Sequence, residues 1–227
     1  MTACNEKEPA QPTPASACRD FNFAALVIGP PQCGKTTFVR GLVVDHLRRY
    51  PTGLAFVHDP NLQFRDICPA YEDVHAWRRA FDAATVSRTP ISRGACVGGQ
   101  WSDVRAMAVA IGRARNTAGN VRVPILLACD ESSMIGDSGR SYVAQEELQL
   151  LSTRRHLGVG PVYNAQQATS LVDAFYALAT DVIAFAQRSE RETLKLEERC
   201  GLPEGALASL VGAARYHYVR IQAGRIV

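Results

Sequence analysis

The residues best suited to chemistry form a glycine-rich segment that leads directly into a lysine and two threonines. In order, this segment reads Gly29, Pro30, Pro31, Gln32, Cys33, Gly34, Lys35, Thr36 and Thr37. It fits the pattern G-x-x-x-x-G-K-[S/T], in which glycines let successive backbone N–H groups point at phosphate oxygens. Lys35 would place a positive charge on the β- and γ-phosphates, and the Thr36 hydroxyl would bind Mg²⁺. The segment therefore predicts a site for ATP together with Mg²⁺.

Two adjacent carboxylates follow an apolar run and form a second group of reactive side chains. Asp130 and Glu131 come directly after residues 123–129, which read as a buried strand. Carboxylates there are costly unless they bind a cation or a partner, and parallel sheets bind ligands at this end of their strands. We expect Asp130 to hold Mg²⁺ through water and Glu131 to orient the water that attacks the γ-phosphate. The alternative is a pair of exposed acids that open a loop.

A glutamine and an arginine flank another apolar run, residues 159–165. Gln166 follows the run, and its amide is a candidate sensor that contacts the γ-phosphate or the attacking water; an ordinary loop amide is the alternative. Arg155 precedes the run and is a candidate arginine finger for the γ-phosphate of a neighbouring subunit. The alternative is a cation placed favourably at a helix C-terminus. Arg188 and Arg191 are weaker finger candidates.

Short apolar runs alternate with amphipathic stretches along the chain, which indicates parallel strands joined by crossover helices. Buried strands are expected at residues 23–28, 54–57, 123–129, 159–165 and 182–186, with a minor strand at 95–97. Helices are expected at residues 36–50, 71–85, 102–115, 146–157 and 171–178. We therefore predict an α/β fold with a mostly parallel central sheet flanked by helices, and a site at the ends of its strands.

The two ends of the chain differ from its alternating middle. Residues 1–20 contain three prolines among small and polar residues, which is typical of a flexible arm. An arm that docks on a neighbouring subunit is the alternative. Residues 216–227 alternate in polarity up to a turn near Ala223 and Gly224, and this pattern predicts a β-hairpin. The sequence thus predicts one arm and a single ATPase domain at residues 21–227.

Composition restricts the class of protein. Of the 227 residues, 47% are hydrophobic, and the formal net charge of +3 argues against a strongly basic DNA-binding tail. The seven cysteines are scattered without a C-x-x-C pair, which argues against a zinc site and favours reduced thiols inside a cell. We find neither a signal peptide nor an apolar run long enough to span a membrane, so we expect a protein that is not secreted.

Four segments together resemble the FtsK/HerA superfamily of DNA-pumping ATPases, closest in type to the compact genome-packaging ATPases of membrane-containing icosahedral viruses. The segments read GPPQCGKTT, LLACDE, RHLGVGPVYNAQQ and DVIAFAQRSERETLKLEERCGLPE. The resemblance spans roughly residues 23–227 and matches the first segment to the family's Walker A motif. It matches Asp130 and Glu131 to the Walker B acid and the catalytic glutamate, and Arg155 and Gln166 to the arginine finger and the sensor glutamine.

This resemblance implies a RecA-like P-loop ATPase of the ASCE type that forms a hexameric ring and threads double-stranded DNA. It implies packaging of a viral genome into a preformed capsid, in the host cytoplasm or the virion. A capsid or membrane protein at the packaging vertex is then a further partner. The chain lacks the transmembrane segments of coupling proteins and septal pumps and the added domains of larger members, which favours the minimal packaging type.

The sequence leaves other functions open. A filamentous-phage assembly, secretion or conjugation ATPase would use the same phosphate loop. A nucleotide-gated structural or interaction protein with little turnover would lack a catalytic acid, and Glu131 argues against it. A small-molecule kinase would carry an arginine-rich lid over the phosphates, and Arg188 and Arg191 match such a lid only weakly.

Contacts with DNA are expected to be few in each subunit. A ring in which several subunits each offer a few basic residues to one phosphate backbone is compatible with a net charge of +3. Candidate contacts lie at residues 88–100, which include Arg88 and Arg93, and at residues 132–141. No recognition helix of a known class is evident, so we expect binding that does not depend on base sequence.

Overall fold

A computed structural model describes residues 21–89, 92–116, 123–130 and 145–227 of the chain. Within these residues, nine strands form one sheet in the order β3-β4-β2-β5-β6-β1-β7-β8-β9. The strands are β1 (Ala25–Ile28), β2 (Leu54–His58), β3 (Ala70–Tyr71), β4 (Gly94–Val97), β5 (Ile125–Cys129), β6 (Val159–Ala165), β7 (Asp181–Phe185), β8 (Tyr218–Gln222) and β9 (Arg225–Ile226). The α-helices are α2 (Lys35–Arg49), α3 (Val74–Ser87), α4 (Trp101–Arg115), α5 (Gln145–Leu157), α6 (Asp173–Leu178) and α7 (Glu190–Cys200).

The centre of the sheet is parallel and fully buried. β1 lies between β6 and β7 and pairs in parallel with both, and β5 pairs in parallel with β2 and β6. Every residue of β1, β5 and β6 is buried, which explains why these strands read as continuous apolar runs. Because the strands are parallel, their carboxyl ends share one edge of the sheet, and the loops that follow them meet there. The expected α/β fold with a mostly parallel sheet is confirmed.

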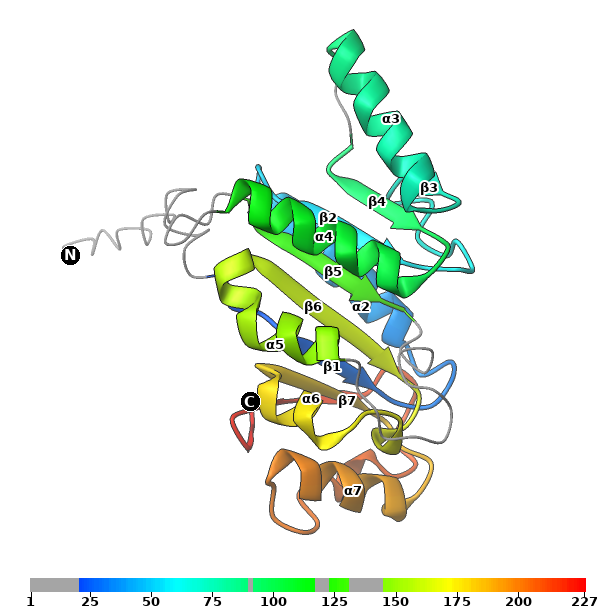
Figure 1. Ribbon diagram of the computed structural model, residues 1–227. Coiled ribbons are helices and arrows are strands. Elements are labelled where there is room, and N and C mark those ends of the chain that lie inside the picture. The colour runs from blue at the N-terminus through cyan, green and yellow to red at the C-terminus, as the bar shows by residue number, and fades with distance from the viewer. Residues whose placement is uncertain (1–20, 90–91, 117–122, 131–144) are drawn as a thin grey trace, which may run out of the picture.

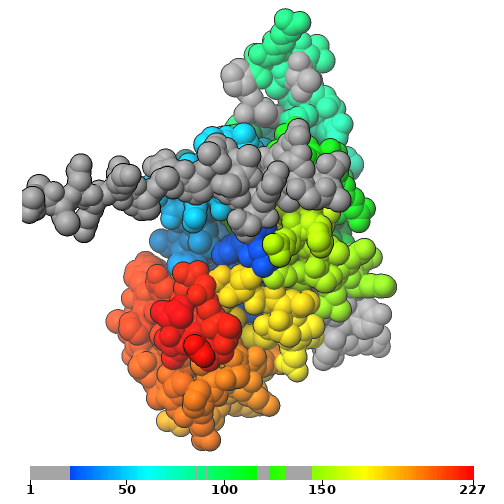
Figure 2. Space-filling view, turned by 90° about the vertical axis from the view of Figure 1, so that its left-hand side faces the viewer, coloured from blue at the N-terminus to red at the C-terminus, as the bar shows by residue number. Residues whose placement is uncertain are grey.

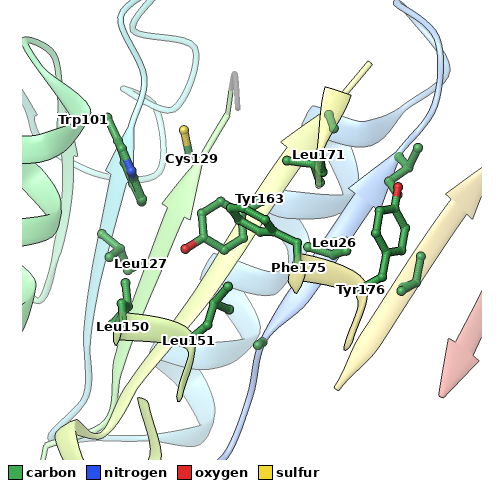
Figure 3. Close-up of a cluster of buried hydrophobic side chains, with 14 of the residues drawn as sticks. Leu26, Trp101, Leu127, Cys129, Leu150, Leu151, Tyr163, Leu171, Phe175 and Tyr176 are labelled. Carbon is green, nitrogen blue, oxygen red and sulfur yellow. The ribbon is translucent and has the colours of Figure 1, made fainter. Parts of the chain in front are cut away.

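Helices cover both faces of the sheet (Figure 1). On one face, α2 packs Val39 and Val43 into a core cluster, while α4, α5, α6 and α7 cover the other face. Figure 3 shows the larger cluster, in which Tyr163 of β6 meets Phe175 of α6 with ring centroids 4.7 Å apart. α3 projects away from this body (Figure 1 and Figure 2). Its Val86 is 86% exposed. Among the helices described, none has the length and apolar character that crossing a bilayer requires.

One buried carboxylate joins α4, α5 and β6. Glu147 of α5 is fully buried, and its oxygens accept hydrogen bonds from Trp101 Nε1 at 2.7 Å, from Tyr163 Oη at 2.8 Å and from Arg105. A buried charge is tolerated when it is paired and its remaining lone pairs are bonded, and these three donors meet that condition. The network therefore holds α5 against β6.

The region before α4 differs from the sequence expectation. Residues 71–85 read as one helix, whereas the short strand β3 comes first and the helix begins only at Val74. Asp73 explains this start, because its Oδ1 accepts the N–H of Ala76 at 2.7 Å as an N-cap residue does. The minor strand expected at residues 95–97 is β4, which is buried between β3 and β2.

The C-terminal part contains a helix that the sequence pattern did not predict and a hairpin that it did. α7 follows β7 and packs Leu196 into the larger core cluster. β8 pairs in antiparallel fashion with β7 and with β9. The turn residues Ala223 and Gly224 have positive φ angles of 47° and 71°, as a two-residue type I′ turn requires. The predicted hairpin is confirmed, and it extends the sheet beyond β7.

Candidate active site

The loop after β1 curls tightly at the carboxyl edge of the sheet. Gln32 and Gly34 have positive φ angles of 64° and 112°, and α2 begins at the next residue. Gly29 leaves no room for a side chain, because a Cβ there would lie 2.7 Å from the Cβ of Phe185 and 2.8 Å from the Sγ of Cys33. The positive φ angle therefore favours glycine at position 34, and close packing favours glycine at position 29. Together they shape a concave backbone at the N-terminus of a helix, where anions bind well.

The side chain of Lys35 folds back over this loop. Its Nζ donates hydrogen bonds to the carbonyl oxygens of Gly29 at 2.7 Å and Pro30 at 2.8 Å, and only 8% of the residue is exposed. Burial lowers the pKa of Lys35, while Cys33 and Asp130 oppose that change. The ammonium group is thus held, largely out of water, beside the concave backbone into which a phosphate would enter.

The other residues of the loop differ in their exposure. Pro31, Gln32 and Thr37 are exposed. Cys33 is buried, with its Sγ 4.0 Å from the Nζ of Lys35. Its side chain therefore packs inside the loop, where a larger residue would displace the lysine.

Thr36 and Asp130 meet although 94 residues separate them along the chain. Thr36 Oγ1 donates to Asp130 Oδ1 at 3.2 Å, and the side-chain amide of Asn164 donates to the same oxygen at 2.9 Å. Burial raises the pKa of the Asp130 carboxyl; the bond from Asn164 opposes the rise and the nearby Asp59 carboxylate adds to it. Because a desolvated carboxylate gains from a bound cation, these hydroxyl and carboxylate oxygens fit Mg²⁺.

A magnesium ion at this place would depend on more than protein ligands. Within the described parts of the chain, no group of three or more His, Cys, Asp or Glu side chains is placed to hold a metal. Mg²⁺ commonly keeps several waters and binds one or two protein oxygens together with substrate phosphates. The pair of Thr36 and Asp130 therefore suits a metal that arrives with a nucleotide.

The end of β6 lies against the beginning of the loop. The N–H of Gly29 donates to the carbonyl oxygen of Ala165 at 3.2 Å, and Gln166, the next residue, is exposed. Gln166 is thus placed at the same edge as Lys35. Glu131 and residues 132–141 lie outside the described residues, so the role of Glu131 stays a prediction.

The candidate arginine fingers differ in position: Arg155 lies at the amino ends of the strands, and Arg188 and Arg191 lie at the carboxyl ends. Arg155 is exposed in the last turn of α5, before the amino end of β6, whereas Gln166 follows the carboxyl end of that strand. A strand of seven residues spans about 23 Å, which is too far for Arg155 to reach the loop of its own chain. Arg188 and Arg191 are exposed just after β7, at the edge that carries the loop.

The basic residues considered for DNA contact lie apart from the loop. Arg93 precedes the amino end of β4 and donates to the Tyr50 carbonyl at 2.7 Å. Arg88 directly follows α3, and both arginines are exposed. Arg93 is therefore at the sheet edge opposite the loop, and residues 132–141 lie outside the described chain.

Two residues beside the loop were not predicted from the sequence. Asn164 lies two residues before Gln166, and a polar residue inside an apolar run was the available signal. Tyr216 precedes β8; its N–H donates to the Cys33 carbonyl at 3.0 Å, and a Cβ on Gly34 would overlap its ring. No local pattern indicates this contact, because it joins segments near opposite ends of the domain.

No protein-family model matches this chain, and no curated protein matches it either. Several solved structures do match this chain. The genome packaging NTPase B204 of Sulfolobus turreted icosahedral virus 2, in complex with AMP, superposes with a TM-score of 0.69 at 14% identity. That match covers 92% of this chain and 97% of B204.

Two further solved structures are also similar to this chain. The pCW3 conjugation coupling protein TcpA matches with a TM-score of 0.60 at 11% identity, over 92% of this chain and 60% of TcpA. VirB4 of Thermoanaerobacter pseudethanolicus matches with a TM-score of 0.59 at 10% identity, over 90% of this chain and 88% of VirB4. These neighbours are P-loop ATPases of the FtsK/HerA type. The chain therefore has the fold of that group, and its structural neighbours include a viral genome-packaging NTPase.

Proposed function

We propose that this protein is an ATP-hydrolysing motor that moves double-stranded DNA, of the type that packages a viral genome into a preformed capsid. The observation that carries the proposal is the meeting of Lys35, Thr36 and Asp130 at the carboxyl edge of the sheet. A desolvated ammonium, a hydroxyl and a half-buried carboxylate surround the mouth of one curled loop. This set matches what a nucleoside triphosphate and a hard divalent cation need.

In this proposal each residue has a distinct task. The loop from Gly29 to Thr37 binds the phosphates through its backbone N–H groups, and Lys35 exchanges its two carbonyl partners for oxygens of the β- and γ-phosphates. Thr36, and Asp130 through water, would hold a magnesium ion, which would supply positive charge to the phosphates. Glu131 orients the attacking water, and Gln166 contacts it or the γ-phosphate.

The proposed active site is shared between subunits. Arg155 lies about 23 Å from the loop of its own chain along β6, so it serves as an arginine finger only for a neighbour. A homo-hexameric ring supplies that neighbour and surrounds a DNA duplex. Such a ring gathers a few cations from each chain onto one phosphate backbone. Arg88, Arg93 and residues 132–141 are the proposed contacts with DNA.

Genome packaging is favoured over the related functions. The packaging NTPase B204 is covered over 97% of its length with a TM-score of 0.69, whereas the conjugation protein TcpA is covered over 60% with a TM-score of 0.60. A conjugation or secretion ATPase is the second candidate, because TcpA and VirB4 share the fold. For the packaging function we propose action in the host cytoplasm or the virion, with a capsid or membrane protein at the packaging vertex as partner. Residues 21–227 would form the single ATPase domain and residues 1–20 its arm.

The proposal is tested by ATP hydrolysis with and without DNA. We expect the full chain to hydrolyse Mg-ATP, and double-stranded DNA at low salt to raise the rate, because phosphate contacts are strongest there. Single-stranded DNA should stimulate less. The mass in solution, measured on the same samples, should correspond to several chains when ATP and DNA are present. A monomer with the same low turnover under every condition would count against both the motor and the shared site.

A further inference from the structure

An exposed aromatic side chain lies directly on the phosphate loop. Tyr216 is 52% exposed, and its backbone N–H donates to the carbonyl of Cys33 at 3.0 Å. Its ring packs so closely on Gly34 that a Cβ at that glycine would overlap two ring carbons. The C-terminal segment before β8 therefore places an aromatic ring at the rim of the loop.

The backbone of Tyr216 is held in a disfavoured conformation. Its φ angle is 71°, in the left-handed region that bulky residues rarely adopt. Such outliers persist when the surroundings fix them, and they cluster at binding sites. Arg215 places its guanidinium carbon over one part of the ring, 4.8 Å from the ring centroid. Half of the tyrosine nevertheless remains open to solvent.

The sheet order indicates where the nucleoside of a bound triphosphate would lie. Asp130 follows β5, and β5 and β6 lie on one side of β1, whereas β7 and the segment that leads into β8 lie on the other. Thr36 and Asp130 would hold a Mg²⁺ ion that arrives with the nucleotide, and Asp130 lies on the β6 side of the loop, so the terminal phosphates would lie toward β6. The α-phosphate, the sugar and the base would then extend toward β7 and β8, where Tyr216 lies.

A second exposed tyrosine in this area is already engaged. Tyr218 packs on Phe38 and Phe185 with ring centroids 5.3 Å and 5.2 Å away. Tyr216 has no comparable ring contact among the described residues, although it is more exposed. Tyr218 thus supports the wall beside the loop, whereas the half-exposed ring of Tyr216 has no aromatic partner among the described residues.

We propose that the ring of Tyr216 stacks against the base of the bound nucleotide and so favours purine nucleoside triphosphates. This inference rests on the proposed ATP site and names the residue that reads the base. Stacking suits the geometry because every base has a flat π surface and purines offer the larger one. Contact with Gly34 alone would require neither an exposed ring nor a disfavoured backbone at Tyr216. Stacking against a base would give both features a function.

The test compares a nucleotide with a ligand that has no base. Calorimetry would give the dissociation constants of Mg-ATP, Mg-CTP and Mg-tripolyphosphate for the wild type, Tyr216→Phe and Tyr216→Asn. Asparagine tolerates the left-handed backbone, so this variant removes the ring with little change to the segment. We expect Tyr216→Asn to bind Mg-ATP about tenfold more weakly and Mg-tripolyphosphate as the wild type does. Tyr216→Phe, and His217→Asn as a control in the same segment, should bind both ligands like the wild type.

The outcomes separate this inference from the proposed function. Equal weakening of both ligands by Tyr216→Asn would mean that the ring only supports the loop, and an unchanged affinity for ATP would mean that it does not touch the base. Either result overturns the inference and leaves the ATP site in place. The wild type alone also decides it, since equal affinities for Mg-ATP, Mg-CTP and Mg-tripolyphosphate contradict base stacking. A wild type that binds none of them overturns the proposed function as well.

Discussion

Replacing Lys35 with alanine is expected to lower the rate of Mg-ATP hydrolysis at least about 100-fold, because removal of one preorganised electrostatic contact to the reacting group costs this much. The side chain is 8% exposed and its ammonium is held by two carbonyl oxygens of the loop, so the charge is already in place before a phosphate enters. The variant should also bind Mg-ATP more weakly in direct titration. Both quantities would be measured on the same preparation as the wild type.

A matched control shows that this loss is specific to the loop. Lys195 lies on α7, where its Nζ pairs with Glu198 at 2.6 Å on the surface, and Lys195→Ala should leave hydrolysis unchanged. The thermal unfolding temperature separates chemistry from folding. Burial lowers the pKa of Lys35, so the fold already disfavours the charged form, and we expect Lys35→Ala not to unfold at a lower temperature. A variant that loses hydrolysis and its folded structure together would contradict the assigned role.

Mixing two inactive variants is expected to restore part of the activity. Arg155→Ala should reduce hydrolysis about 1000-fold, as the loss of an arginine finger does, and Glu131→Gln should bind ATP without turning it over. Arg155 lies at the edge of the sheet opposite its own loop. In a mixed ring, an intact site would form wherever the Arg155 of a Glu131→Gln subunit meets the Glu131 of an Arg155→Ala subunit.

The mixing experiment carries its own controls. Arg115→Ala removes another exposed arginine, at the end of α4, and should hydrolyse ATP at the wild-type rate. Activity would be recorded over a range of mixing ratios with double-stranded DNA present, and it should peak near equal amounts. If no ratio restores activity although mixed assemblies form, Arg155 does not act in trans. Arg188 and Arg191, which lie at the edge of the loop, then become the residues to replace.

The sequence was most informative where one local pattern contains the whole feature. The phosphate loop is a continuous segment, and glycines at its two ends meet backbone and packing demands that only a small residue satisfies, so its position follows from spacing alone. The buried strands could also be predicted from the sequence, because a parallel strand covered on both faces is apolar at nearly every position. Fold class and loop could therefore be predicted together.

Features that depend on distant contacts could not be predicted in this way. Asn164 interrupts an apolar strand, but its bond to Asp130 becomes visible only when β5 and β6 pair side by side. Tyr216 reads as one residue of an alternating strand, and only the folded chain shows it on Gly34. The start of α3 was misplaced because Tyr71 has a strand partner in β4, a tertiary contact that overrides local helical spacing.

If ATP hydrolysis at this loop moves the protein along double-stranded DNA, the protein should displace a third strand that is bound to the duplex. A labelled oligonucleotide would be bound as a triplex at one end of a linear duplex, and its release followed after the full-length protein and Mg-ATP are added. We expect release by the wild type, and none by Lys35→Ala or with a non-hydrolysable ATP analogue. Wild-type protein that hydrolyses ATP on this DNA but leaves the triplex intact would contradict movement along the duplex.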